Sequence, residues 1–174
     1  RNIAVSLEDL AAGFSKKLKV SRKVQDSQSG AITSSTNILT VDGRPGVKAG
    51  TKYTFSDAGD QLIGQPRQDI QFVLVEKSHA SFSREGDDLV TTVSLPLVDA
   101  LCGGDVQVPL LNGRSTCVHM DRIDPQSSAV VSGEGMPRKH GGRGDVFVKF
   151  NIIFPKSPLT QSQKEGLMNF LPSK

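Results

Sequence analysis

The residues that could carry out chemistry are few and scattered along the chain. The three histidines, His79, His119 and His140, show no HExxH or other metal-ligand spacing, and no GxSxG or Walker pattern occurs. Asp87 and Asp88 are adjacent carboxylates, but neighbours in a strand or turn usually point apart, which favours a solvated turn. The sequence therefore predicts neither an enzyme nor a bound metal or cofactor.

Cys102 and Cys117 form neither a CxxC pair nor a zinc-binding spacing. We expect two buried, reduced thiols rather than a disulfide, which is typical of the cytoplasm. No run approaches about 18 apolar residues, and the N-terminus lacks the charged-then-apolar order of a signal peptide. These features favour a cytoplasmic protein that does not contact membranes.

Glycines and basic residues crowd together in GEGMPRKHGGRGD, residues 133–145. A phosphate-binding loop, an Arg-Gly-Asp adhesion loop and a hairpin turn are three interpretations. A phosphate-binding loop requires a helix after the glycines, whereas the strand-like run VFVKFNIIF follows here. The Arg-Gly-Asp triplet is a short match that chance often produces. A hairpin turn is therefore the favoured interpretation.

The net charge of +3 and the pI near 9.0 are too small to predict nucleic-acid binding alone. Five basic residues nevertheless gather within eight positions: Lys16, Lys17, Lys19, Arg22 and Lys23. A basic nucleic-acid-binding β module is the alternative function that this cluster keeps open. The cluster contains no aromatic residue on which a base could stack, since Tyr53 is the only tyrosine and lies elsewhere.

In an extended strand, the even-numbered residues from Lys16 to Arg22 share one face, on which Leu18 and Val20 lie between two cations. Such a face suits an extended guest, whose backbone could pair along the strand edge. Lysines also protect strand edges against indiscriminate pairing, so an ordinary sheet edge is the competing interpretation.

The chain contains an internal repeat. LEDLAAG at 7–13 resembles LVDALCG at 97–103, a displacement of 97 − 7 = 90, and GDQLIGQPRQD at 59–69 resembles GMPRKHGGRGD at 135–145, a displacement of 135 − 59 = 76. The first copy thus holds about 14 additional residues (90 − 76 = 14), and we expect most of them in the polar stretch 25–36, as an extended loop. Shifted by 90, the lysines at 16, 17 and 19 fall on Val106, Gln107 and Pro109, so the first copy is specialised for a partner.

Each copy begins with a short helix followed by strand-like alternation of apolar and polar residues. Ser6 and Asp9 suit a helix N-terminus, and Gly13 and Gly103 suit C-terminal caps. The predicted fold is mainly β: two tandem β-sandwich-like subdomains with short helices, at 1–86 and 87–156, and a C-terminal amphipathic helix at 157–174.

The C-terminal helix begins after Pro158, where Thr160 and Gln163 form a capping-box pattern. Its apolar stripe consists of Leu167, Phe170 and Leu171. The stripe must be buried either against its own subdomain or against a second copy of the chain.

Several stretches together resemble the C-terminal region of DnaJ-type co-chaperones (J-domain proteins): VSLEDLAAGFSKKLKVSRK, KAGTKYTFSDAGDQ, LPLVDALCGG, GEGMP and RGDVFVKFNIIFP. They span nearly the whole chain in the family's order. The zinc-binding CxxCxGxG repeats are absent, so the chain resembles the class without a zinc finger. The J domain and the Gly/Phe-rich linker lie upstream in the family, so the resemblance is to the substrate-binding and dimerisation portion.

The resemblance implies a homodimer whose first subdomain binds unfolded polypeptide segments in a shallow groove. The acidic C-terminal tail of a DnaK-type chaperone would dock at the same subdomain. Carried over by position, the groove would consist of Ile3, Leu18, Val20 and Phe82, the tail would meet Lys16, Lys17 and Arg22, and the dimer would form through Leu167, Phe170 and Leu171. One further groove position falls at Arg1, where the family commonly has an aliphatic residue.

Overall fold

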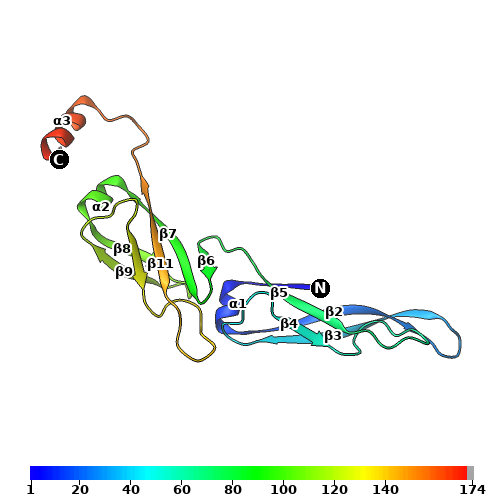
Figure 1. Ribbon diagram of the computed structural model, residues 1–174. Coiled ribbons are helices and arrows are strands. Elements are labelled where there is room, and N and C mark those ends of the chain that lie inside the picture. Colours follow the sequence, from blue (N-terminus) through cyan, green and yellow to red (C-terminus); the bar gives the residue numbers. More distant parts are fainter. Residues whose placement is uncertain (172–174) are drawn as a thin grey trace.

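The computed structural model describes residues 1–171 and is elongated. Two β units follow one another along the molecule, and the C-terminal helix stands apart at one end, beyond an extended segment (Figure 1). The predicted mainly β class is confirmed. None of the helices in residues 1–171 combines the length and apolar character needed to cross a membrane.

The first unit contains β1 (Asn2–Val5), α1 (Leu7–Ala12), β2 (Phe14–Gln25), β3 (Ile32–Gly43), β4 (Lys52–Phe55) and β5 (Ile70–Glu76). Strand β5 lies between β1, its parallel neighbour, and β4, its antiparallel neighbour. Strands β2 and β3 form a separate antiparallel hairpin. Alternate residues of these strands are buried together, including Ile3, Val20, Leu39, Val41, Phe72 and Leu74.

The second unit contains β6 (Phe82–Glu85), β7 (Asp88–Pro96), α2 (Leu97–Cys102), β8 (Gly104–Pro109), β9 (Ser115–Met120), β10 (Ser128–Val131) and β11 (Val146–Ile153). Its sheet has the order β10-β11-β7-β6, with β11 parallel to β7, and β8 pairs with β9 in a separate hairpin. Strand β6 precedes the predicted boundary at residue 86 but pairs with β7, so the second sheet includes residues 82–85.

The predicted repeat is visible in matching contacts. Helices α1 and α2 begin at Leu7 and Leu97, 90 residues apart. The Gly59 N–H donates to the Gln68 carbonyl at 2.7 Å, and the Gly135 N–H donates to the Gly144 carbonyl at 2.8 Å, a displacement of 135 − 59 = 76 in each partner. A Cβ atom at Gly59 would lie 2.7 Å from the Gln68 oxygen, so the close backbone approach requires glycine there.

The glycine-rich segment at 133–145 is a hairpin turn, as predicted. Pro137 and Arg143 form an antiparallel bridge, and the Arg138 N–H donates to the Gly142 carbonyl. The Asp145 carboxylate accepts the Gly133 N–H at 2.8 Å, and the Arg143 Nε donates to the Gly135 carbonyl. The charged residues of the Arg-Gly-Asp triplet thus hold the turn together.

Two predictions are wrong. The stretch at 25–36 is not an extended loop, because β3 begins at Ile32 and only 26–31 connect the strands. The additional residues lengthen the hairpin to strands of 12 residues, against 6 in β8 and β9. Cys102 and Cys117 are free, as expected, but both are exposed rather than buried. Cys102 ends α2 and Cys117 points outward from a short two-stranded hairpin, so neither position lies under another layer.

Helix α3 (Gln161–Phe170) begins with the predicted capping box. The Thr160 N–H donates to the Gln163 side chain at 2.9 Å, and the Gln163 N–H donates to the Thr160 hydroxyl at 3.4 Å. No residue of α3 is buried within its own chain. Residues 172–174, part of the predicted helical tail, lie outside the described residues.

Candidate functional site

The side chains predicted to line the groove are buried to different depths. Ile3, Val20 and Phe82 are 4%, 2% and 8% exposed and belong to the hydrophobic core. Leu18 is half-buried and packs against that core. Of the four, Leu18 therefore offers the most accessible apolar surface, while the other three belong to the core.

The outer edge of β2 is open along most of its length. At its far end, the Gln25 N–H donates to the Gln61 carbonyl, and the Lys23 carbonyl accepts the Gln61 N–H. Lys23 and Gln25 thus point their backbone groups away from β3, and strand alternation directs those of residues 15, 17, 19 and 21 the same way. Within residues 1–171, no strand pairs with this part of the edge.

Strand β1 presents a second open edge, because it pairs only with β5 among the described strands. Two observations relate the two edges. The Lys16 Nζ donates to the Ala4 carbonyl at 3.3 Å. Arg1, next to β1, and Ser21 of β2 both line a hollow with a volume of about 260 Å³, which is mostly polar. An extended segment could therefore lie between β1 and β2.

The basic residues of β2 are not equivalent. The Lys16 ammonium lies 3.2 Å from the Asp9 carboxylate and 5.8 Å from the centre of the Phe14 ring. Lys17 and Lys19 are exposed on the opposite face of the strand. Arg22 is half-buried, and its Nε is buried without a hydrogen-bond partner in the described part of the chain.

A contact that the sequence patterns did not indicate joins α1 to Phe82. The His79 Nδ1 accepts the backbone N–H groups of Ser81 and Phe82, both at 3.1 Å, while its Nε2 lies 3.0 Å from the Glu8 carboxylate. The Glu8 backbone N–H, with a smaller contribution from His79, lowers the pKa of the Glu8 carboxyl. His79 thus acts as a packing and capping residue, and it fixes the backbone that carries Phe82.

A second accessible surface is bordered by α2, the segment after β11 and α3. Its hollow has a volume of about 510 Å³ and an almost wholly apolar lining: Leu97, Val98, Leu101, Phe154, Pro155, Ser157, Pro158, Leu159 and Leu167. Phe170 on α3 is 87% exposed, and Leu171 is also exposed. The predicted stripe is therefore uncovered in the single chain.

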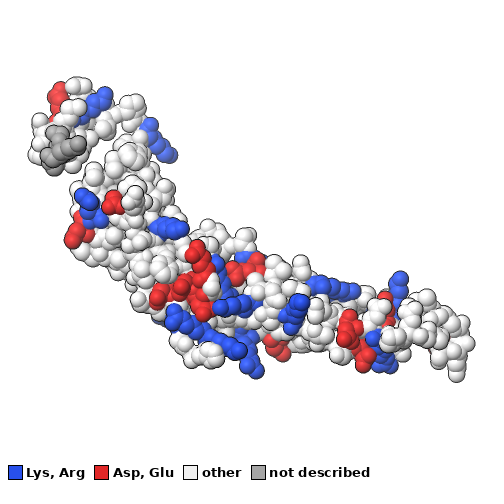
Figure 2. All heavy atoms as spheres, in the orientation of Figure 1, with Lys and Arg blue, Asp and Glu red and all other residues white. Residues whose placement is uncertain are grey.

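Residues 1–171 hold no group of three or more His, Cys, Asp or Glu side chains arranged to bind a metal ion. Figure 2 shows basic and acidic side chains interspersed over the visible face of both β units. This face has no continuous basic surface of the kind that follows a nucleic-acid backbone.

Comparison with known proteins agrees with this architecture. The family model of the DnaJ C-terminal domain matches residues 1–155. The chain is 40% identical over 173 residues to Protein psi1 of Schizosaccharomyces pombe, covering 98% of this chain and 45% of that protein. It is 36% identical over 176 residues to DnaJ protein homolog 1 of Drosophila melanogaster, covering 99% and 52%.

Protein SIS1 of Saccharomyces cerevisiae is 35% identical over 171 residues, covering 95% of this chain and 47% of that protein. The chain thus spans about half the length of these curated relatives. With the family model matched over both β units, the chain belongs to the DnaJ C-terminal domain family.

Proposed function

We propose that this chain is the client-holding portion of a co-chaperone and that unfolded segments bind as an added strand along the open edge of β2. The observation that carries the proposal is that β1 and β2 each have an edge with no strand neighbour among residues 1–171. A guest strand there would pair with backbone groups of residues 15–21 and cover the half-buried Leu18.

This mode of binding predicts promiscuous client binding of modest affinity. Each backbone hydrogen bond contributes about 0.5–1.5 kcal/mol whatever the guest sequence. Association itself costs about 4 kcal/mol or more, and only one half-buried leucine adds apolar contact. Single segments should therefore bind weakly, and the exposed Lys17 and Lys19 should discourage the edge from pairing with another copy of itself.

The second unit supports this reading, because the residue equivalent to Lys19 is Pro109 (19 + 90 = 109). Proline has no N–H, so the equivalent edge of β8 lacks a donor at this position. The repeat thus contains one edge that can accept a strand and one edge that is blocked.

Lys19→Pro tests the proposal by giving the first edge the residue of the second. Because the Lys19 N–H points away from β3, no internal ladder bond is lost, whereas binding of an unfolded peptide should fall at least about tenfold. Lys19→Thr is the matched control, since it removes the charge but keeps the N–H. Isothermal titration with one extended peptide measures both variants, and equal affinity for Lys19→Pro and Lys19→Thr would contradict edge pairing.

We also propose that the acidic tail of a DnaK-type chaperone docks beside this edge at Lys16, Lys17 and Arg22. Lys17 is exposed, whereas the Arg22 Nε is buried without a hydrogen-bond partner within residues 1–171, so a tail could reach that Nε only after the Arg22 side chain turns outward. Lys16 is already paired with Asp9, so a tail carboxylate must compete with the protein's own carboxylate there.

Finally, we propose a homodimer formed by α3 and the apolar hollow beside α2. The hollow and the exposed stripe of Leu167, Phe170 and Leu171 offer apolar surfaces that a second chain would bury. Two linked edges would then bind one long client more tightly through effective concentration, without new contacts. Sedimentation should show halved mass for Phe170→Asp and unchanged mass for Lys164→Asp, a control on the exposed polar part of the same helix. A constant mass across the wild type and both variants would contradict the proposed dimer.

A further inference from the structure

Arg84 connects the two β units from a buried position. It lies in β6, within the sheet of the second unit, yet its side chain is directed toward the first unit and is only 5% exposed. Its Nη1 donates to the Val47 carbonyl at 2.9 Å, and its Nη2 donates to the Gly46 carbonyl at 3.0 Å. Both carbonyls belong to the loop between β3 and β4 of the first unit.

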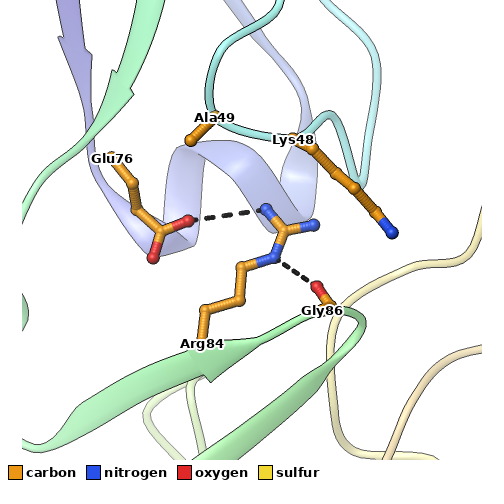
Figure 3. A pocket seen from close by; sticks show the side chains of 5 residues that line it. All are labelled: Lys48, Ala49, Glu76, Arg84 and Gly86. Atoms are coloured by element: carbon orange, nitrogen blue, oxygen red, sulfur yellow. Dashed lines mark hydrogen bonds and ion pairs between the residues drawn. The ribbon is translucent and has the colours of Figure 1, made fainter.

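The same guanidinium also contacts the turn after β6 and the carboxylate of Glu76. Figure 3 shows Arg84 between Glu76 and Gly86, beside a cavity of about 320 Å³. The Nε donates to the Gly86 carbonyl at 2.8 Å, and Nη1 lies 3.7 Å from the Glu76 carboxylate at the end of β5. One planar group therefore contacts three carbonyls on two backbone segments, together with one carboxylate. Lysine cannot reproduce this, because its ammonium is a single point of donation.

Gly46 forms a second, independent contact at this junction. Its N–H donates to the Leu10 carbonyl of α1 at 2.7 Å. A Cβ atom at Gly46 would lie 2.1 Å from the Pro137 carbonyl oxygen in the glycine-rich turn of the second unit. Lys48 and Asp87 add an ion pair across the units, with Nζ and Oδ1 3.2 Å apart. The loop at 44–50 is thus fastened to the second unit at both its backbone and its side chains.

We propose that Arg84 is a positioning residue that locks the first unit at one angle to the second. The covalent connection between β5 and β6 is the short segment 77–81, so the units could otherwise pivot about it. Removing the guanidinium would leave the partly buried carbonyls of Gly46 and Val47, and the exposed carbonyl of Gly86, without this donor, which disfavours the locked arrangement.

The functional consequence rests on the proposed edge pairing and the proposed dimer. The client-binding edge lies in the first unit, whereas α3 follows the second unit. A fixed junction would hold the two edges of a dimer at one separation, which is the condition for bivalent binding of a long client. Arg84 would thus affect long clients while leaving the binding of short peptides unchanged.

The test measures the distance between the units in the full chain. Spin labels at Thr40→Cys and Ser128→Cys, both exposed and one in each unit, are introduced after replacing Cys102 and Cys117 with serine. The labelled chain is mixed with excess unlabelled chain. Double electron–electron resonance measures the distance between the two labels. It should give one narrow distance distribution for the otherwise wild-type protein and a clearly broadened or shifted one for Arg84→Met.

Arg122→Met is the matched control, because the Arg122 side chain is 72% exposed and pairs only within the second unit. It should leave the distribution unchanged. Arg84→Lys should broaden it to a smaller extent, and Gly46→Ala should displace it even though Arg84 is intact. If Arg84→Met fails to fold, Arg84→Lys decides the matter: a distribution identical to that of the wild type would overturn the proposal.

A second readout separates this inference from the proposed function. Affinity for one short extended peptide should match that of the wild type in Arg84→Met, whereas affinity for a long denatured client, such as reduced carboxymethylated α-lactalbumin, should fall about tenfold. If the wild type binds no short peptide, the proposed edge pairing at β2 is wrong, whereas the proposed role of Arg84 at the junction is unaffected. If Arg84→Met broadens the distance distribution but leaves the affinity for the long client unchanged, Arg84 fixes the angle between the units but does not contribute to bivalent binding. If the distance distribution is unchanged, Arg84 does not fix that angle.

Discussion

The two β units repeat one arrangement of helix, hairpin and central strand, although the second sheet also includes β6 and the first hairpin is longer. Each has a central strand with a parallel neighbour, a six-residue helix and an antiparallel hairpin. In the first unit, the leading hairpin strand carries lysines, and Leu18 is half-buried; in the second, the equivalent Val108 is fully buried. A repeated scaffold can therefore be adapted to a partner by a few residues without a new fold.

The largest expected effect is on stability, and it tests the buried apolar position that the two units share. Val20→Asp and Leu110→Asp should each destabilise their own unit by about 3–5 kcal/mol, because both side chains are buried and the new charge would have no partner. Amide hydrogen exchange resolves the two units separately. Lys19→Asp, one residue from Val20 on the exposed face, should change little. Full protection in Val20→Asp would mean that this position is accessible after all.

Leu18→Ala and Val108→Ala sharpen the difference between the units. Val108→Ala should lower the free energy of unfolding by about 2 kcal/mol, because it leaves a cavity in the buried core. Leu18→Ala should lower it by about 1 kcal/mol or less, because Leu18 is only half-buried. Only Leu18→Ala should weaken peptide binding. Urea unfolding and peptide titration measure the two quantities, and a peptide affinity reduced equally by both changes would argue against a site confined to the first unit.

Asp9→Asn and Asp99→Asn compare equivalent helix positions, 90 residues apart. Asp9 holds the Lys16 ammonium, so Asp9→Asn should strengthen binding of a peptide ending in consecutive acidic residues by up to about fivefold. Asp99 lies in α2, opposite a strand without lysines, and its change should have no effect. Fluorescence anisotropy with the acidic peptide provides the measurement. Unchanged affinity in Asp9→Asn would exclude Lys16 from the docking surface.

The smallest expected effect concerns pH and only the second hairpin. Hydrogen bonding to the Asp105 carboxylate, at 2.7 Å, raises the pKa of His119 above its ordinary value of 6.5. The raised folded-state pKa means that this pair stabilises the hairpin fully below pH 6.5 and progressively less as the pH rises through the folded value. Amide exchange in β8 and β9 should increase slightly over this range. Asp105→Asn should abolish the dependence, and an unaltered response would contradict this origin.

Local sequence signals predicted much of the fold. The helix caps at Ser6 and Thr160 and the alternation along β2 are confirmed, because each depends on neighbours in the chain. Periodicity gave the correct inward face of β2 but not its depth, so Val20 and Leu18 could not be distinguished in advance. The long hairpin was missed because its polar distal half is held by backbone pairing rather than by an apolar pattern.

The candidate site was predicted only in part. The groove role of Ile3, Leu18, Val20 and Phe82 stays a prediction, now centred on the edge of β2. Contacts between residues far apart in the chain, such as His79 with Glu8, leave no periodic trace. Arg84 was missed for the same reason, since its buried position follows from a junction that forms only when both units are folded.

The membership of β6 in the second sheet determines how this protein can be divided for study. A fragment that ends at residue 86 would contain β6 without β7, its partner in the sheet. Phe82 and Arg84 would then lie on a strand that has no sheet to join. The complementary fragment would lose a border strand together with the Ser81 carbonyl that accepts the hydroxyl of the buried Thr91. A cut within 78–80 keeps Lys77 with the first ladder and Ser81 with the second, and it should yield soluble halves where a cut at residue 86 yields precipitate.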